Sequence, residues 1–202
     1  MNLIIDIRGN GGGADRAYDS ITPYLYTNPI RTMWVAFLST PLNNARYDWV
    51  SKLDGFSEKE RQGFRDMQKK LNARIGAFVN LSEANQTVVI DTLPIVYQNP
   101  QQVAILIDGA NASTAEQFIL MVKQSKKVKL FGQKTAGALD FSNLNNVTSP
   151  SGNYKLFYAT SRSFRILKMA IDDYGIQPDY FIDESFPSYK WIEFVSETMK
   201  TK

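Results

Sequence analysis

The sequence predicts an α/β domain built on a mixed β-sheet. Two apolar stretches, residues 3–7 and 103–107, each lead into a turn of small residues and then into a helical pattern, which is typical of parallel α/β units. The turn at residues 150–153 lies between two further stretches and predicts an antiparallel pair. Both strand-to-helix turns would aim backbone N–H groups at the space above the strand ends, so we expect an anion or oxyanion site there.

Composition limits the number of domains and the classes of function. The 202 residues are 44% hydrophobic, which is enough to bury the core of a single domain, residues 1–202. The net charge is +3 and no basic stripe carries interleaved aromatic side chains, so we expect no nucleic-acid partner. No apolar stretch reaches the roughly 18 residues of a membrane span, and we expect no signal peptide on this chain.

The absence of two residue types narrows the chemistry. Without cysteine, the chain has no disulfide, no thiolate metal site and no cysteine nucleophile. Without histidine, it lacks the commonest general base and metal ligand. We therefore expect no metal and no cofactor, and a hydrolytic site would need its base from another group.

Hydrophobic periodicity places the elements in order along the chain. Short apolar runs between turn residues predict strands, and apolar residues three or four positions apart predict helices. Besides 3–7 and 103–107, the predicted strands are 32–38, 87–90, 94–97 and 128–131, with a short one after the turn 175–179. The predicted helices are 14–21, 114–124 and 189–199. Strands 103–107 and 128–131 flank a helix and should be parallel, whereas 87–90 and 94–97 are placed for a hairpin.

A helical insertion is predicted at about residues 41–91. Ser57 and Glu60 have the spacing of a capping box, and apolar residues recur at three and four positions from Phe64 to Phe78. The segment interrupts the strand pattern, so we expect an insertion or a lid.

The glycine turn after the first strand admits two interpretations. Gly9–Ala14 fits the dinucleotide pattern G-x-G-x-x-A. That pattern also needs an acidic residue at the end of the second strand, where the chain has Leu38–Thr40. The residues therefore favour a tight turn with positive φ angles, with Asp6 and Arg8 paired at the strand end.

The serine turn before the second helix also admits two interpretations. Ser113 and Glu116 have the S-x-x-E spacing of a capping box, so Ser113 could cap the helix. A serine at a strand-to-helix turn is also exposed beside backbone N–H donors, as a nucleophile requires. The glycine turn could supply a second donor.

Four motifs follow one another along most of the chain. They are Asp6-Ile-Arg-x-Asn10-x-Gly12-Gly13, Asn111-Ala-Ser-Thr-Ala-Glu116, Gly132-Gln-Lys-Thr135-Ala-Gly137 and Gly175-Ile-x-Pro178-Asp179. In type, order and spacing they resemble the serine peptidases of the carboxyl-terminal processing (tail-specific) and tricorn-core family. The resemblance implies a crotonase-like (ClpP/crotonase) mixed sheet with βαβ units. It also implies that this chain is the C-terminal catalytic part of a longer protein.

Site residues carry over from the family by position. The resemblance assigns Ser113 as the nucleophile, and the backbone N–H of Thr114 as one oxyanion donor. The second donor comes from the glycine turn, with Gly12 favoured over Gly13. The substrate class implied is extended polypeptide, which in this family joins the sheet as an added strand.

The general base is where the chain departs from the family. In the processing branch a lysine follows the third motif, and the matching position here is Ala138. Lys134 lies inside that turn, and a role as base would require burial to depress its pKa. The tricorn-like branch uses a histidine upstream of the glycine turn. The resemblance therefore places the base on the N-terminal part of the longer protein, which we call the parent. Glu116 is then interpreted as a cap partner and Asp140 as a loop acid.

Three functions remain open from the sequence. The first is a serine peptidase, of which this fragment alone should be inactive or weakly active because its serine lacks a base. The second is a non-catalytic peptide-binding module that has lost the base. The third is a crotonase-like acyl-group enzyme, since that fold also builds paired N–H oxyanion holes. By resemblance, the parent would act outside the cytoplasm, in the periplasm or cell envelope.

Overall fold

The computed structural model describes residues 2–200, and the chain divides into two units. The first unit contains the residues up to Thr32, then Val89–Leu139, and the segment from Met169 onwards. The second unit contains Met33–Val88 and Asp140–Lys168. Most of the predicted insertion therefore belongs to the second unit.

A four-stranded parallel sheet forms the centre of the first unit. Its order is β1-β6-β7-β10, with β6 paired in parallel to both β1 and β7, and β7 to β10. The strand bounds are β1 Asn2–Asp6, β6 Gln102–Ile107, β7 Val128–Gly132 and β10 Tyr180–Phe181. Helix α4, Thr114–Val122, connects β6 to β7, so the predicted βαβ unit is confirmed.

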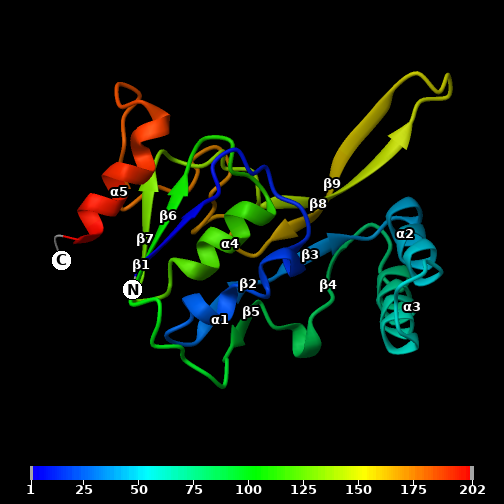
Figure 1. The fold of residues 1–202 in the computed structure, drawn as a ribbon. Helices are drawn as coiled ribbons and strands as arrows, with labels where there is room; N and C mark the ends of the chain where they lie inside the picture. The colour runs from blue at the N-terminus through cyan, green and yellow to red at the C-terminus, as the bar shows by residue number, and fades with distance from the viewer. Residues whose placement is uncertain (1, 201–202) are drawn as a thin grey trace. The chain divides into compact units, whose positions relative to one another are not determined.

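Strand β6 explains why this unit is stable. Residues Val103–Ile107 are all 1% exposed or less, because alternate side chains enter two different cores. Ile105 packs in the cluster that contains Ile119 of α4, and Leu106 in the cluster that contains Val195 of helix α5, Trp191–Lys200. Figure 1 shows α4 on one side of these strands and α5 on the other.

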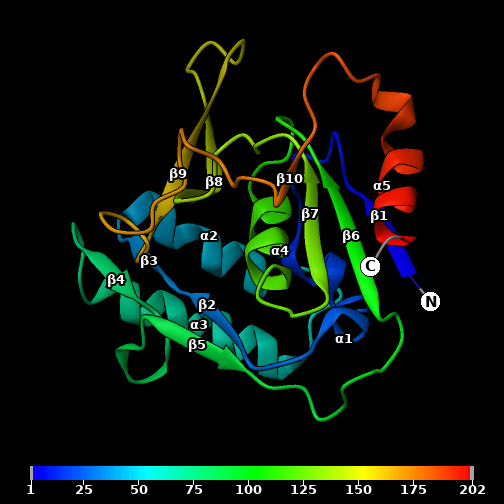
Figure 2. The same cartoon turned by 90° about the vertical axis from the view of Figure 1, so that its left-hand side faces the viewer.

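The second unit is built on an antiparallel sheet of order β4-β3-β9-β8. Strands β8 and β9 form the long hairpin predicted around residues 150–153, which projects in Figures 1 and 2. The capping box of Ser57 and Glu60 is present and starts α3, as predicted. The element bounds are β3 Val35–Leu38, α2 Pro41–Ser51, α3 Glu58–Asn72, β4 Phe78–Asn80, η2 Glu83–Asn85, β8 Phe141–Thr148 and β9 Lys155–Ser163.

A buried ion pair closes the base of the β8–β9 hairpin. Asp140 Oδ1 accepts a hydrogen bond from Arg165 Nε at 2.8 Å, and the two side chains are 1% and 5% exposed. The Ser163 N–H donates to the Asp140 backbone oxygen at 2.7 Å. Asp140 therefore lies in the loop before β8, as predicted, but it is buried and paired with Arg165, which follows β9.

Several local predictions need correction. The strand expected at 32–38 divides at Trp34 into β2, Ile30–Met33, and β3. Strand β5, Val88–Asp91, pairs with β2, and residues 94–97 form no strand, so the predicted hairpin is wrong. The helix expected at 14–21 is instead a 3-10 turn, η1 Asp15–Tyr18, followed by the short helix α1 Thr22–Leu25. The closing helix α5 is Trp191–Lys200, preceded by η3 Ser188–Lys190.

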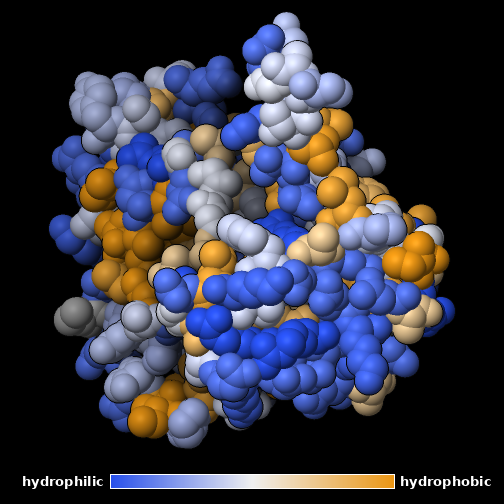
Figure 3. All heavy atoms as spheres, turned by 90° about the vertical axis from the view of Figure 1, so that its right-hand side faces the viewer, coloured by the Kyte–Doolittle hydropathy of each residue, from blue (hydrophilic) through white to orange (hydrophobic). Residues whose placement is uncertain are grey.

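One face of the protein is mainly polar. Figure 3 shows a face on which hydrophilic side chains dominate and hydrophobic ones form separate patches. Exposed apolar side chains of the second unit include Trp49, Leu144 and Phe157. Scattered exposure of this kind is normal for a protein surface. No helix within residues 2–200 combines the length and apolarity that crossing a membrane requires.

Candidate active site

Ser113 lies at the turn between β6 and α4, in a backbone conformation that serine rarely adopts. Its φ is 55° and its ψ is −124°, and its side chain makes no capping hydrogen bond to the helix. The capping interpretation is therefore wrong. Within residues 2–200, the Ser113 hydroxyl has no hydrogen-bond partner. A non-glycine residue at such angles costs on the order of 1–3 kcal/mol, so the surrounding structure must hold it there.

Backbone hydrogen bonds on both sides fix Ser113. Its N–H donates to the Ala138 oxygen at 3.1 Å, and its own oxygen accepts from the Gln117 N–H at 2.9 Å. The first bond ties the serine to the turn after β7, and the second starts helix α4. The half-buried serine is thus held with its hydroxyl unpaired, as the strand-to-helix turns of serine hydrolases hold their nucleophile.

Asn111 links the serine turn to the glycine turn. It is fully buried, and its Nδ2 donates to the Ile7 oxygen at 2.6 Å and to the Asn10 oxygen at 3.2 Å. Its Oδ1 accepts from the Asp108 N–H at 2.9 Å, and its backbone oxygen accepts from the Ala136 N–H at 2.9 Å. The sequence placed Asn111 in a motif but gave it no role. Its role here is to join three loops through one amide.

The glycine turn passes directly against the start of α4. A Cβ placed on Gly12 would lie 2.8 Å from the Ala112 oxygen, 2.9 Å from Ser113 Cβ and 3.0 Å from the Thr114 nitrogen. The φ of Gly12 is also positive, at 107°. A side chain at this position is therefore excluded by both space and backbone conformation. The structure brings together the two turns that the sequence predicted as one site.

The backbone N–H groups around Ser113 differ in whether they already form a hydrogen bond. The Gly12 N–H donates to Asn10 Oδ1 at 2.9 Å within the turn. Among the described residues, the N–H groups of Gly13 and Thr114 donate to no partner. The Thr114 hydroxyl lies 2.9 Å from the Gly13 oxygen and holds the two segments together.

Glu116 is completely buried and does not act as the cap partner that its spacing suggested. Its Oε1 accepts hydrogen bonds from Thr135 Oγ1 and, at 2.8 Å, from the Gly137 N–H. Its Oε2 accepts from the Ala138 N–H at 2.8 Å. The carboxylate thus binds a turn about twenty residues downstream instead of the start of its own helix.

Two residues of this turn, Lys134 and Ala138, bear on the question of the general base. Lys134 is exposed, so it lacks the burial that the role of a general base was expected to require. Ala138 occupies the position where the processing branch has lysine, and its side chain has no proton-accepting atom. No cluster of three or more acidic side chains within residues 2–200 is placed to hold a metal.

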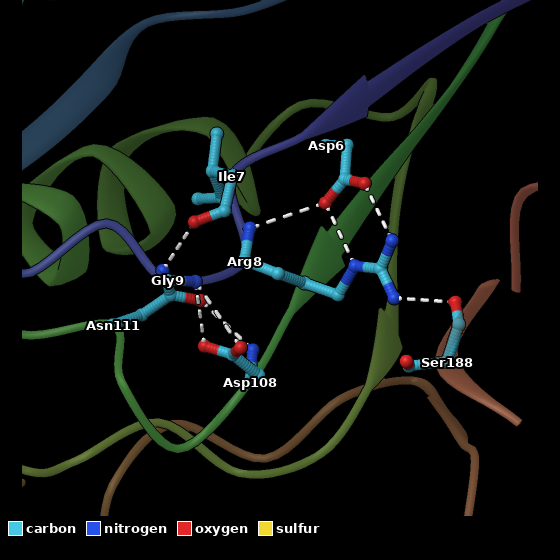
Figure 4. Close-up of polar contacts among 7 residues, drawn as sticks. All are labelled: Asp6, Ile7, Arg8, Gly9, Asp108, Asn111 and Ser188. Carbon is cyan, nitrogen blue, oxygen red and sulfur yellow. Dashed lines mark hydrogen bonds and ion pairs between the residues drawn. The ribbon is translucent and has the colours of Figure 1, made fainter.

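Asp6 and Arg8 pair at the end of β1, as predicted (Figure 4). Arg8 Nε donates to Asp6 Oδ1 at 2.9 Å, and Nη2 donates to Oδ2 at 2.7 Å. The guanidinium also donates to the Ser188 oxygen and lies 4.9 Å from the ring centre of Trp191. Hydrogen bonding from Arg8 lowers the pKa of the Asp6 carboxyl.

An open cavity of about 810 Å³ adjoins this pair at the carboxyl ends of the parallel strands. Its walls include Asp6, Arg8, Asp108 and part of the segment 184–191. Asp108 accepts a hydrogen bond from the Gly9 N–H at 3.1 Å, which fixes the start of the glycine turn (Figure 4). The ion pair at the end of β1 and the Asp108 carboxylate thus hold the start of the glycine turn in place.

A serine at a strand-to-helix turn, with a glycine turn packed against it, is typical of α/β serine hydrolases. Residues 1–182 match the model of peptidase family S41, and the chain belongs to this serine-peptidase family. A search of the curated proteins found no match. The peptidase family that the four motifs predict is therefore confirmed.

Three solved structures are similar to this chain in fold. Mature CPAF complexed with lactacystin is 16% identical with a TM-score of 0.65, over 99% of this chain and 43% of that one. A putative peptidase from Parabacteroides merdae is 14% identical with a TM-score of 0.59, over 99% and 51%. The photosystem II D1 C-terminal processing protease is 16% identical with a TM-score of 0.50, over 95% and 37%. The chain therefore spans about half or less of the length of these proteins.

Proposed function

We propose that residues 1–202 form one catalytic domain, with a crotonase-like fold, of a serine peptidase that hydrolyses peptide bonds in extended polypeptides. The observation that carries the proposal is the placement of Ser113 in a strained turn, where neither its hydroxyl nor the neighbouring N–H groups of Gly13 and Thr114 have a partner within residues 2–200. Family membership supports a peptidase. The family resemblance supports a parent that acts outside the cytoplasm.

The chemistry follows from the positions of these groups. Ser113 Oγ attacks the carbonyl carbon of the scissile bond while a base takes its proton, and the carbonyl oxygen becomes an oxyanion. The N–H groups of Thr114 and Gly13 bind that oxyanion, and one such donor is worth about 3 kcal/mol of barrier. Gly12 keeps its N–H on Asn10 and allows the close approach of the two turns. The leaving amine takes the proton, and water then hydrolyses the acyl-enzyme.

The base belongs to a part of the protein that precedes this chain. The chain has no histidine, Ala138 replaces the family lysine, and Lys134 is exposed. We propose that the N-terminal part of the parent completes the site. The match to mature CPAF covers 99% of this chain but only 43% of the CPAF chain. This difference in length supports a longer parent.

A second function is a peptide-binding module that has lost catalysis. It is favoured by one observation on the sequence, which has no histidine and has Ala138 where the family resemblance expects a lysine. The gene sequence upstream of Met1 distinguishes the two functions. A histidine there supports the peptidase, and its absence supports the binding module.

We expect the isolated 202-residue chain to show little or no cleavage of casein, because a serine without a base keeps a hydroxyl pKa far above neutrality. The parent should cleave casein, and Ser113→Ala in the parent should abolish the cleavage. Release of casein fragments over time measures both. Vigorous cleavage by the isolated chain would contradict the proposal and make Lys134 the candidate base, to be checked with Lys134→Ala.

A further inference from the structure

Glu116 is a buried carboxylate near the serine turn that the proposed chemistry does not use. It is 0% exposed, and no lysine or arginine within residues 2–200 forms an ion pair with it. Burying a carboxylate is costly unless hydrogen bonds replace the lost water. Here the replacement comes from Thr135 Oγ1 and the N–H groups of Gly137 and Ala138.

The turn that Glu116 holds is the one that holds Ser113. Ala138 uses both of its backbone polar groups in this connection. Its N–H donates to Glu116 Oε2 at 2.8 Å, and its oxygen accepts the Ser113 N–H at 3.1 Å. A single residue therefore separates the buried carboxylate from the backbone of the serine.

The same turn is fixed at its other end. The Thr135 hydroxyl donates to Glu116 and accepts from the Ile176 N–H at 2.7 Å. A Cβ on Gly137 would lie 2.5 Å from the Ile171 oxygen, so the chain passes there with no room for a side chain. Glu116 thus connects this turn to Ser113, whose positive φ of 55° needs support from the surrounding structure.

We propose that Glu116 is a positioning residue for the nucleophile. Its carboxylate holds the turn 135–138, and through the Ala138 oxygen this turn keeps Ser113 at a φ of 55° with its hydroxyl free. Glu116 is not the general base, because both of its oxygens accept hydrogen bonds from this turn and, among the described residues, neither forms one with Ser113. The inference rests on the proposed function of Ser113.

Glu116→Gln tests the inference by removing one hydrogen bond, the one from the Ala138 N–H to Glu116 Oε2. The glutamine can keep its oxygen toward Thr135 and Gly137, but its NH₂ group then faces the Ala138 N–H, and two donors cannot bond. Thr135→Val is the matched control, because it removes a hydrogen bond from the same carboxylate and leaves the Ala138 contact in place. Both variants should lower stability, and only Glu116→Gln should disturb Ser113.

Two readouts separate positioning from stability. Amide hydrogen exchange at the Ser113 N–H should speed up in Glu116→Gln and stay close to the unmodified rate in Thr135→Val. In the parent, the maximum rate of acylation by a fluorophosphonate should fall by about 10- to 100-fold in Glu116→Gln, since small misplacements of a reacting group have effects of this size. The apparent affinity for the probe should not change.

Equal effects of the two variants on acylation, or unchanged Ser113 exchange in Glu116→Gln, would overturn the positioning role. Absence of any label on Ser113 in the unmodified parent would instead overturn the proposed function, and the exchange data would still decide the positioning role. If Glu116→Gln does not fold, Glu116→Asp gives the same readings, because it keeps the charge but withdraws the oxygens by one methylene group.

Discussion

Gly12→Ala in the parent should lower kcat/KM for peptide cleavage by more than about tenfold, because it displaces a turn that supplies an oxyanion donor. The added Cβ would lie 2.8 Å from the Ala112 oxygen and 2.9 Å from Ser113 Cβ. Either the glycine turn or the start of α4 must move. Both movements change the distance between the N–H donors and the serine.

Gly9→Ala is the matched control for this substitution. Gly9 also has a positive φ, at 77°, but a Cβ there meets no atom within 4 Å. It therefore reports the cost of the backbone conformation alone. Both variants should have a lower Tm than the unmodified parent. Only Gly12→Ala should also show a kcat/KM more than about tenfold lower when measured well below its Tm. Equal turnover in the two variants would mean that the close approach at Gly12 is unimportant to catalysis.

Asp140→Leu should destabilise the fold by about 3–5 kcal/mol, because it leaves the Arg165 guanidinium buried without its partner. The Asp140 and Arg165 side chains are 1% and 5% exposed, so water cannot replace the lost contact. For a chain of this length the loss corresponds to a fall in Tm of about 6–20 °C. Urea unfolding followed by circular dichroism measures the change in free energy.

The double variant Asp140→Leu/Arg165→Met tests whether the loss of stability comes from leaving one charge buried without its partner. Replacing both charges with apolar groups of similar volume should recover much of the stability, since a buried pair is often no better than apolar packing. Arg165→Met alone should be strongly destabilising, like Asp140→Leu. If each single variant lost less than about 1 kcal/mol, the pair would be behaving as a solvated surface pair.

The first unit could be predicted from the sequence because its signals are local. The run Val103–Ile107 is apolar throughout, as a strand buried on both faces requires, and α4 follows with apolar residues at helical spacing. Ser113 was located by its motif. Its backbone conformation could not be predicted, because the bond from its N–H goes to Ala138, far along the chain.

The errors share a physical cause, which is a partner distant in sequence. Ser113 and Glu116 have the sequence spacing of a capping box, but this spacing does not reveal whether the glutamate side chain turns back to the start of the helix. The competing donors, Gly137 and Ala138, are set by tertiary packing. Strand β5 was assigned to a neighbouring hairpin, but its partner is β2. Local patterns carry no information about either pairing.

Mapping the covalent label tests the central claim most directly. The parent is treated with a fluorophosphonate and digested, and the modified peptide is identified by mass spectrometry. We predict one labelled residue, Ser113, with no label in Ser113→Ala or in the isolated 202-residue chain, because only the parent supplies the base. A label on a different serine, or one that persists in Ser113→Ala, would contradict the account.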